Sequence, residues 1–370
     1  MDAVLNNHRH KLNPQSDTSN EKQLVNIINH YRSLISKPGL SRSEEKSFRE
    51  ISGFFHELWI TPFEKYMKGI NSLLIVPDGI LGTIFFETLT NSKKQYLIEK
   101  YNITYAQSLM IAERTYERKY PADRKPLLAL GGAEYAMNKT SEKPAELSEN
   151  IEGIRNQADQ ILKRGDNTRA LYSRMGYTKW KNLPGTLKEV ETLSSIIPES
   201  DIKTGKNVSE IDIKKMSESG DLSKYRIIHF ATHGIVIPEI PELSALVLSL
   251  SDDAKNNNDG YLTMKEISKL KIKADFVNLS ACNTGLGKIY EGEGVVGLSQ
   301  AFLVAGSISM SVSLWQVSDE STKEFMTGLY LLVKKEGLSF SEAMSKMKRN
   351  FIKNNKWKQP FYWARFNAER

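Results

Sequence analysis

The sequence of 370 residues contains one cysteine and no long uninterrupted hydrophobic segment. A single cysteine cannot form an internal disulfide, which suits a reducing, cytoplasmic environment. The most apolar stretch, residues 72–86, is broken by Pro77, Asp78 and Gly79 and therefore cannot cross a bilayer. The first residues lack the apolar core of a secretory signal. These absences predict a cytoplasmic protein that does not insert into a membrane.

Long basic runs are also missing, although Lys and Arg (51) outnumber Asp and Glu (44). The excess is spread along the chain, which indicates a solvated surface and no direct binding of nucleic acid. Six scattered histidines offer no metal-ligand spacing, so we expect no metal ion. Gly292-x-Gly294-x-x-Gly297 matches a dinucleotide fingerprint, but it follows a loop-like segment, and Glu291 and Glu293 would repel a pyrophosphate. We therefore expect no nucleotide cofactor.

Hydrophobic residues make up 40% of the chain and charged residues 26%, a composition typical of folded globular proteins. The pattern along the chain predicts a flexible tail at 1–20 and N-terminal helices at 21–68. A first half follows at 69–183, with a polar insert at 133–183. The second half, 184–370, alternates apolar strands with helices.

This alternation predicts an α/β fold, with a mainly parallel sheet covered by helices on both faces. The predicted strands are 72–77, 126–132, 225–231, 244–250, 275–281 and 307–314. The predicted helices are 22–36, 43–67, a segment around 147–162, 183–197, 263–270, 294–305, 319–335 and 339–353. In such sheets, ligands bind at the carboxyl ends of the strands.

Two residues with catalytic potential each lie just past the end of a predicted strand. Cys282 lies in "NLSACNTG" and His233 lies in "HFATHG". Because the carboxyl ends of parallel strands meet at one edge, we expect the two side chains to lie close together. A nucleophilic cysteine needs a base that generates the thiolate and a backbone N–H that holds the oxyanion. Gly234 follows the histidine and offers an N–H that no side chain crowds.

A structural interpretation competes with the catalytic one. A lone cysteine is more often a small inert hydrophobe, and a histidine on a strand is more often a structural residue. We apply this second interpretation to His229, which lies inside an apolar run and is expected to point into the core. The matched positions of Cys282 and His233 after two strands favour catalysis for that pair.

A series of ordered segments resembles the CHAT family of caspase-like cysteine peptidases, relatives of caspases and separase. The resemblance runs from about Leu58 to Phe366 and includes "LLIVPDGILGTIFFETL", "LPGTLKEVETL", "YRIIHFATHG", "VNLSACNTG" and "EGEGVVGLSQAFLVAGSISMSVSLWQV". It implies that His233 and Cys282 form a catalytic dyad and that the Gly234 N–H serves the oxyanion. Cys282 follows His233 by 49 residues, close to the caspase separation of about 50.

The resemblance implies that 184–370 is the catalytic caspase-like half and that 69–183 is a degenerate, pseudo-caspase-like half. It also implies a cysteine endopeptidase that cleaves a protein substrate and stays latent until a partner or effector activates it. Relatives often act in bacterial defence or programmed cell death under a sensor protein. The glycine-rich and polar content of 285–293 and 315–320 suggests loops that become ordered on activation. Self-cleavage in 133–183 or in 251–260 is a related expectation. The alternative is a catalytically silent, caspase-like interaction module.

The sequence departs from the family in two places. The family often has Trp-Pro-Val-Asp-Asp where this chain has Trp315-Gln316-Val317-Ser318-Asp319, so one acidic side chain is missing. The helical repeats that often precede the domain are represented by only two predicted helices.

Residues around the predicted catalytic edge suggest how a substrate binds. The segment that carries Trp315 would pair with an extended substrate by strand addition, with Trp315 forming the wall of a pocket. A core position for this tryptophan is equally compatible with its size. Four acidic residues would favour a cationic residue before the cleaved bond: Asp275, Glu291, Glu293 and Asp319.

Overall fold

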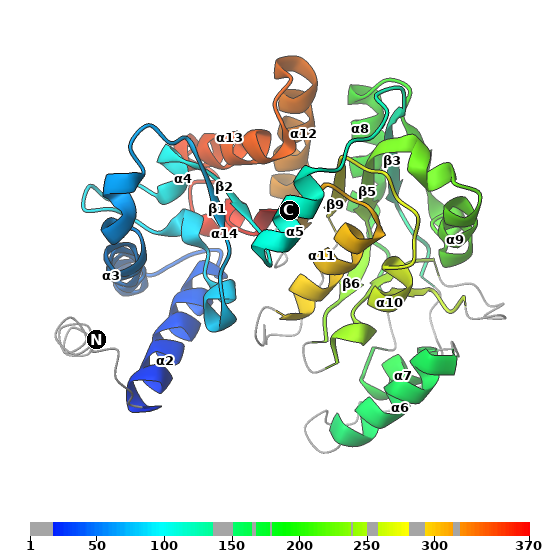
Figure 1. Ribbon diagram of the computed structural model, residues 1–370, viewed down its shortest axis with the longest axis horizontal. Helices are drawn as coiled ribbons and strands as arrows, with labels where there is room; N and C mark the ends of the chain where they lie inside the picture. Colours follow the sequence, from blue (N-terminus) through cyan, green and yellow to red (C-terminus); the bar gives the residue numbers. More distant parts are fainter. Residues whose placement is uncertain are drawn as a thin grey trace. The chain divides into compact units, whose positions relative to one another are not determined.

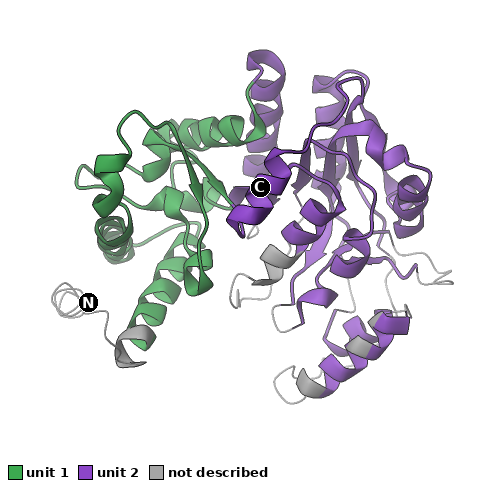
Figure 2. Cartoon of the chain, viewed as in Figure 1, with its two compact units in different colours: residues 1–105, 338–365 green, residues 106–337, 366–370 purple. Residues whose placement is uncertain are grey.

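The computed structural model describes residues 18–135, 151–164, 168–177, 180–237, 240–249, 258–280, 293–313 and 319–370. Side chains at 18–21, 151–152, 159, 162, 293–297 and 319 are not described. The chain forms two compact units (Figure 2). Unit 1 comprises Met1–Tyr105 and Leu338–Arg365, and unit 2 comprises Ala106–Gly337 and Phe366–Arg370. Unit 1 thus combines an N-terminal and a C-terminal segment of the chain.

Unit 1 packs helices around a short parallel strand pair. Its strands are β1 (Ser72–Ile75) and β2 (Asn102–Tyr105). Its helices are α2 (Thr18–Ile35), α3 (Arg42–Trp59), α4 (Leu97–Lys100), α13 (Phe340–Lys353) and α14 (Pro360–Trp363). Helix α3 begins at a capping box formed by Ser41 and Glu44. It ends before the predicted residue 67, because Pro62 has no N–H to continue the helix and a 3-10 helix follows at Thr61–Tyr66.

The larger sheet of unit 2 contains six strands in the order β11-β10-β9-β5-β3-β4. Their bounds are β3 (Lys125–Gly131), β4 (Asp201–Lys203), β5 (Tyr225–Ala231), β9 (Phe276–Leu279), β10 (Ser309–Ser313) and β11 (Phe366–Glu369). All neighbouring pairs are parallel except β10 with β11. The predicted mainly parallel sheet is therefore confirmed.

Helices cover both faces of this sheet (Figure 1). On one face, α8 (Pro184–Ile196) contacts β3 and β5, and α12 (Asp319–Glu336) contacts α8. On the other face, α11 (Glu293–Ala305) contacts β10 and α10 (Met264–Ile267). The remaining described helices of unit 2 are α5 (Leu109–Tyr116), α6 (Ile151–Arg164), α7 (Arg169–Arg174) and α9 (Glu210–Glu218). The prediction of helices on both faces is confirmed.

A second, antiparallel sheet follows β5. It contains β6 (His233–Ile235), β7 (Ala245–Val247) and β8 (Tyr261–Thr263). The predicted strand 244–250, which contains β7, therefore does not belong to the parallel sheet. The connection from β6 to β7 is shorter than the crossover of about a dozen residues that a parallel pair requires.

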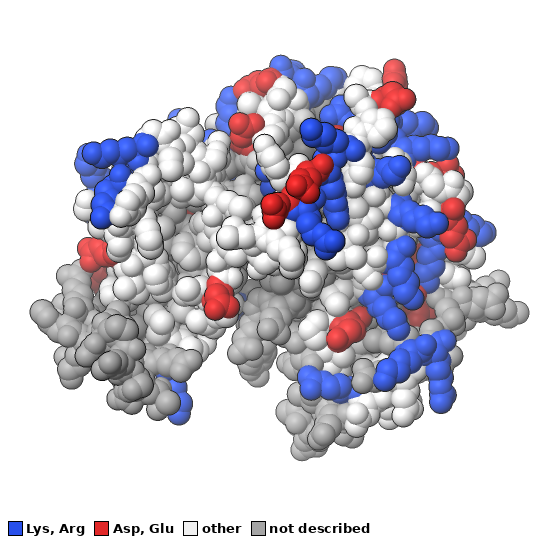
Figure 3. Space-filling model, in the orientation of Figure 1, with Lys and Arg blue, Asp and Glu red and all other residues white. Residues whose placement is uncertain are grey.

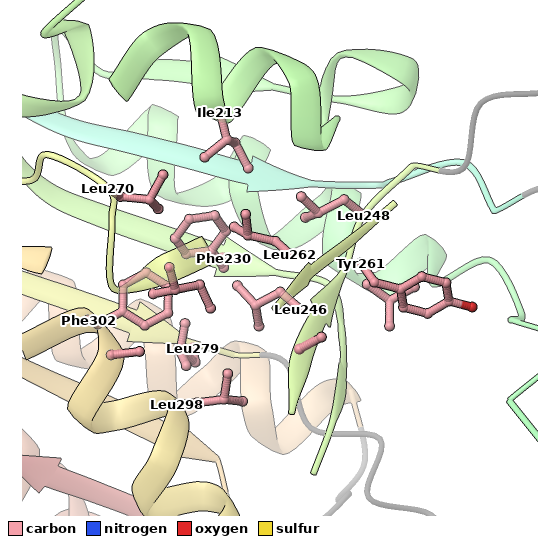
Figure 4. Close-up of a cluster of buried hydrophobic side chains, with 14 of the residues drawn as sticks. Ile213, Phe230, Leu246, Leu248, Tyr261, Leu262, Leu270, Leu279, Leu298 and Phe302 are labelled. Carbon is pink, nitrogen blue, oxygen red and sulfur yellow. The ribbon is translucent and has the colours of Figure 1, made fainter. Parts of the chain in front are cut away.

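The core of unit 2 lies between the parallel sheet, the small sheet and α11 (Figure 4). Successive side chains of a strand point to opposite faces. Phe230 accordingly points into this core, with its ring 5.6 Å from that of Phe302, whereas His229 points toward α8 and α12. Because side chains alternate in this way, the face of the sheet toward α8 carries a row of polar side chains, whereas the face toward the core is apolar.

Two further observations concern the charged side chains at the surface and the hydrophobicity of the described helices. On the face drawn in Figure 3, Lys and Arg side chains have Asp and Glu side chains among them. None of the described helices is long and apolar enough to cross a membrane.

Candidate active site at the ends of β5 and β9

His233 is held in a defined orientation just beyond the end of β5. Its side chain is buried, and Nε2 lies 2.7 Å from the carbonyl oxygen of Lys181. The rings of Tyr135 and Trp180 lie 4.8 and 4.9 Å from the imidazole, and the main-chain N–H of His233 donates to the Tyr135 hydroxyl at 3.2 Å. A main-chain carbonyl and two aromatic rings therefore fix the ring.

The hydrogen bond to Lys181 also determines the tautomer of His233. A carbonyl oxygen can only accept, so Nε2 carries the hydrogen and Nδ1 holds the lone pair of the neutral ring. Burial lowers the pKa of His233 below its usual value, and the hydrogen bond to the Lys181 carbonyl opposes this only in part. The arrangement favours a neutral imidazole with its lone pair on Nδ1.

The end of β9 lies beside the end of β5. The two strands are parallel neighbours, with Phe230 opposite Leu279 (Figure 1). The N–H of Ser280 donates to the carbonyl of Phe230 at 2.9 Å. Ser280 precedes Cys282 by two residues, and Cys282 itself lies outside the described residues. The described main chain thus approaches the cysteine from the strand next to the one that leads to His233.

The other predicted site residues differ in how much of each the structure describes. Gly234 is buried in β6, opposite Leu246 of β7. Trp315 and Glu291 lie outside the described residues. Glu293 and Asp319 are the first residues of α11 and α12, and their side chains are not described.

Asp275, predicted to line an acidic substrate pocket, lies away from the strand ends that lead to His233 and Ser280. Asp275 directly precedes β9, at its amino end, whereas Ser280 follows the carboxyl end. Its carboxylate pairs with Arg124 at 2.6 Å and with Arg226 at 2.9 Å. A strand rises by about 3.3 Å per residue, so β9 separates Asp275 from the edge that holds His233.

Sequence reasoning missed the residues that hold His233. Tyr135, Trp180 and Lys181 belong to the segment 133–183, which was interpreted as a polar insert. The aromatic residues of this segment were the sequence signal that it packs against the fold. In the structure, the rings of Tyr177 and Trp180 stack with their centroids 6.0 Å apart. Tyr135, Trp180 and Lys181 therefore form a wall of the site.

Sequence reasoning also missed a buried polar network beneath the strand ends. His229 is buried, as expected, but its Nδ1 lies 3.0 Å from both the Tyr330 hydroxyl and the Asn278 amide nitrogen. Its Nε2 lies 3.2 Å from the Glu189 carboxylate, which also accepts from Ser280 Oγ at 2.8 Å. Among the residues that the structure describes, no group of His, Cys, Asp and Glu is arranged to hold a metal ion.

The model of the CHAT domain family matches residues 50–369 of the chain. The chain belongs to this family. A comparison with curated proteins gives no match.

Solved structures similar to this CHAT protein include the Saccharomyces cerevisiae separase–securin complex, at 14% identity and a TM-score of 0.42. That match covers 93% of this chain and only 20% of the separase chain. The complex of Porphyromonas gingivalis RgpB pro- and mature domains matches at 11% identity and a TM-score of 0.44, covering 95% of this chain and 76% of the other. The Arg-specific cysteine proteinase gingipain R matches at 12% identity and a TM-score of 0.40, covering 94% and 74%.

Proposed function

We propose that this CHAT protein is a cysteine endopeptidase that uses Cys282 as nucleophile and His233 as base. The observation that carries the proposal is the hydrogen bond from His233 Nε2 to the Lys181 carbonyl. It leaves the lone pair on Nδ1, at the sheet edge from which the chain continues to the cysteine. A main-chain carbonyl thereby takes the orienting role that a third side chain has in a triad.

The mechanism follows from these residue types. His233 Nδ1 takes the proton of the Cys282 thiol, and the thiolate attacks the scissile carbonyl carbon. The N–H groups of Gly234 and Cys282 hold the oxyanion. The imidazolium then protonates the leaving amine, and water hydrolyses the thioester with His233 again acting as base.

Three predicted acidic residues remain candidates for a pocket that binds a cationic side chain before the cleaved bond. They are Glu291, Glu293 and Asp319, with Trp315 as a wall. The test is a panel of peptide substrates with Arg, Lys, Asp, Leu or Met at this position. Preference for Arg or Lys supports the pocket, and a preference for Asp contradicts it.

Activation by a protein partner completes the proposal. A cytoplasmic endopeptidase that is always active would be harmful, and the family resemblance implies control by a sensor in defence or cell death. Full activity of the isolated protein, without a lag or an activator, would contradict latency.

We predict that alkylation of Cys282 by iodoacetamide depends on His233. Cys282 is the only cysteine, so the mass shift reports this thiol alone. His233→Ala should slow alkylation at neutral pH by about tenfold or more, because the thiolate loses its base. His30→Ala, which changes an exposed histidine of α2, is the control and should leave the rate unchanged.

Cleavage itself is tested by comparing protein termini in cells that express wild type or Cys282→Ala. New termini in the wild type alone support the endopeptidase. Equal alkylation rates in wild type and His233→Ala, together with identical termini, would favour the silent interaction module.

A further inference from the structure

One buried carboxylate contacts both strands that lead to the proposed dyad. Glu189 lies on α8 and is 6% exposed. Its Oε1 accepts from Ser280 Oγ at 2.8 Å and lies 3.2 Å from His229 Nε2. Ser280 precedes Cys282 by two residues, and His229 precedes His233 by four. One oxygen atom of Glu189 therefore links α8 to both chain segments that lead to the proposed dyad, through Ser280 and through His229.

The two contacts of Glu189 differ in kind. The bond from Ser280 has hydrogen-bond geometry. The contact with His229 is close but poorly aligned, and Nε2 has no hydrogen-bond partner. Attraction to the carboxylate favours a hydrogen on Nε2, which leaves Nδ1 to accept from the Tyr330 hydroxyl at 3.0 Å. The Asn278 amide N–H can only donate to Nδ1, so it and the carboxylate favour the same His229 tautomer.

Packing alone does not account for a carboxylate at this position. A buried charge costs several kcal/mol of desolvation, and an apolar residue of similar size often stabilises such a site equally well. Most of the residues around Glu189 on α8 that face the sheet are apolar, among them Val190 and Leu193. The polar residues His229, Asn278 and Ser280 lie on the strand segments that lead to the proposed dyad, and Ser311 of β10 extends this row opposite Asn278.

We propose that Glu189 is a positioning residue, which holds the ends of β5 and β9 in the geometry that the dyad requires. This inference rests on the proposed function. Ser280 transmits the constraint to Cys282 through two peptide units, and His229 transmits it to His233 along β5. Loss of the carboxylate releases both strand ends, and a displacement of about 1 Å between reacting groups can reduce a rate by about a hundredfold.

The experiment compares four variants of the full chain, of which Ser280→Ala removes the hydroxyl that donates to Glu189. Glu189→Ala removes the carboxylate, and Glu189→Gln retains an oxygen that can accept from Ser280 but removes the charge. Glu191→Gln removes the charge of an exposed residue on the same helix and serves as the matched control. The readouts are the rate constant for alkylation of Cys282 as a function of pH and the urea midpoint of unfolding.

We expect Glu189→Ala to lower the alkylation rate at neutral pH by about tenfold or more and to move the thiol titration to higher pH, as expected when a thiolate loses its base. Glu189→Gln should lie between Glu189→Ala and wild type, and Glu191→Gln should match wild type. With a cleavable peptide, kcat should fall while KM changes by less than about twofold, because only transition-state interactions are lost.

Three outcomes overturn the proposal. In the first, Glu189→Ala has the alkylation profile of wild type. In the second, Glu189→Ala does not fold and the folded Glu189→Gln and Ser280→Ala variants both have the wild-type profile. In either case, His233-dependent alkylation of wild type leaves the endopeptidase proposal standing. In the third, alkylation of wild type does not depend on His233, and the proposed function fails together with this inference.

Discussion

At the scale of single residues, the surroundings of His233 determine its orientation, its tautomer and its protonation state. The Lys181 carbonyl fixes the ring and its tautomer, and burial between Tyr135 and Trp180 disfavours the protonated form. Removal from water penalises the charged imidazolium, and burial therefore lowers the pKa of His233. The same burial keeps the proposed base neutral at neutral pH.

The lowered pKa of His233 has a consequence for stability. Because the folded-state pKa lies below the unfolded value of about 6.5, the unfolded chain binds the proton more readily. The contribution of neutral His233 to stability is thus present above that value and is lost as the pH falls through it. We predict that His233→Asn reduces the loss of stability between pH 7.5 and 5.5, measured by urea unfolding. An equal loss in wild type and variant would contradict this.

At the scale of elements, α8 lies very close to β3. The Thr186 hydroxyl accepts from the Gly132 N–H at 2.9 Å. A side chain at Gly131 would place Cβ 2.6 Å from the Thr186 carbonyl oxygen and 2.8 Å from Val190 Cγ1. Only glycine allows α8, and with it Glu189, this approach to the sheet.

We predict that Gly131→Ala destabilises the protein by about 1–3 kcal/mol, because the helix must move away from the strand. The control is Gly53→Ala in α3, where Cβ would lie 3.9 Å from its nearest neighbour, the Thr90 carbonyl oxygen. That change should be neutral or stabilising, since alanine favours a helix over glycine by about 1 kcal/mol. Equal unfolding midpoints for the two variants would argue against tight packing of α8.

At the scale of the whole molecule, residues far apart in the sequence complete unit 1. Lys348 of α13 lies 2.5 Å from Glu87, and both side chains are buried. The Tyr105 hydroxyl also donates to Glu87. Arg349 adds a bond to Asn102 at 2.7 Å. The segment 338–365 thus joins the N-terminal part of the chain through specific polar contacts.

We predict that Lys348→Met destabilises the protein by about 3–5 kcal/mol, because it leaves a buried carboxylate without its cationic partner. Adding Glu87→Gln should recover much of this loss, since the double variant removes the uncompensated charge. Lys353→Met changes an exposed lysine of the same helix and should have little effect. Additive effects in a double-mutant cycle, measured by urea unfolding, would show that the pair is not coupled.

The sequence by itself determined the strands and helices whose residues repeat with a regular period. β5, β10 and α12 lie within a few residues of their predicted bounds, because each buries apolar side chains along one or two faces. The order of strands and helices also predicted that the chain segments leading to His233 and Cys282 end at one edge. The sequence pattern did not predict the short strands β4 and β11, because three or four residues are too few to show a regular hydrophobic period.

Only the tertiary structure decided which groups meet at that edge. The Lys181 carbonyl lies 52 residues from His233, and Glu189 lies 91 residues from Ser280. Asp275, expected at the site, pairs with two arginines at the opposite end of β9. The physical reason is that periodicity reports burial, whereas the partner of a carbonyl or a carboxylate depends on how distant segments pack. A local pattern therefore specifies the strand, and the packed fold specifies the site.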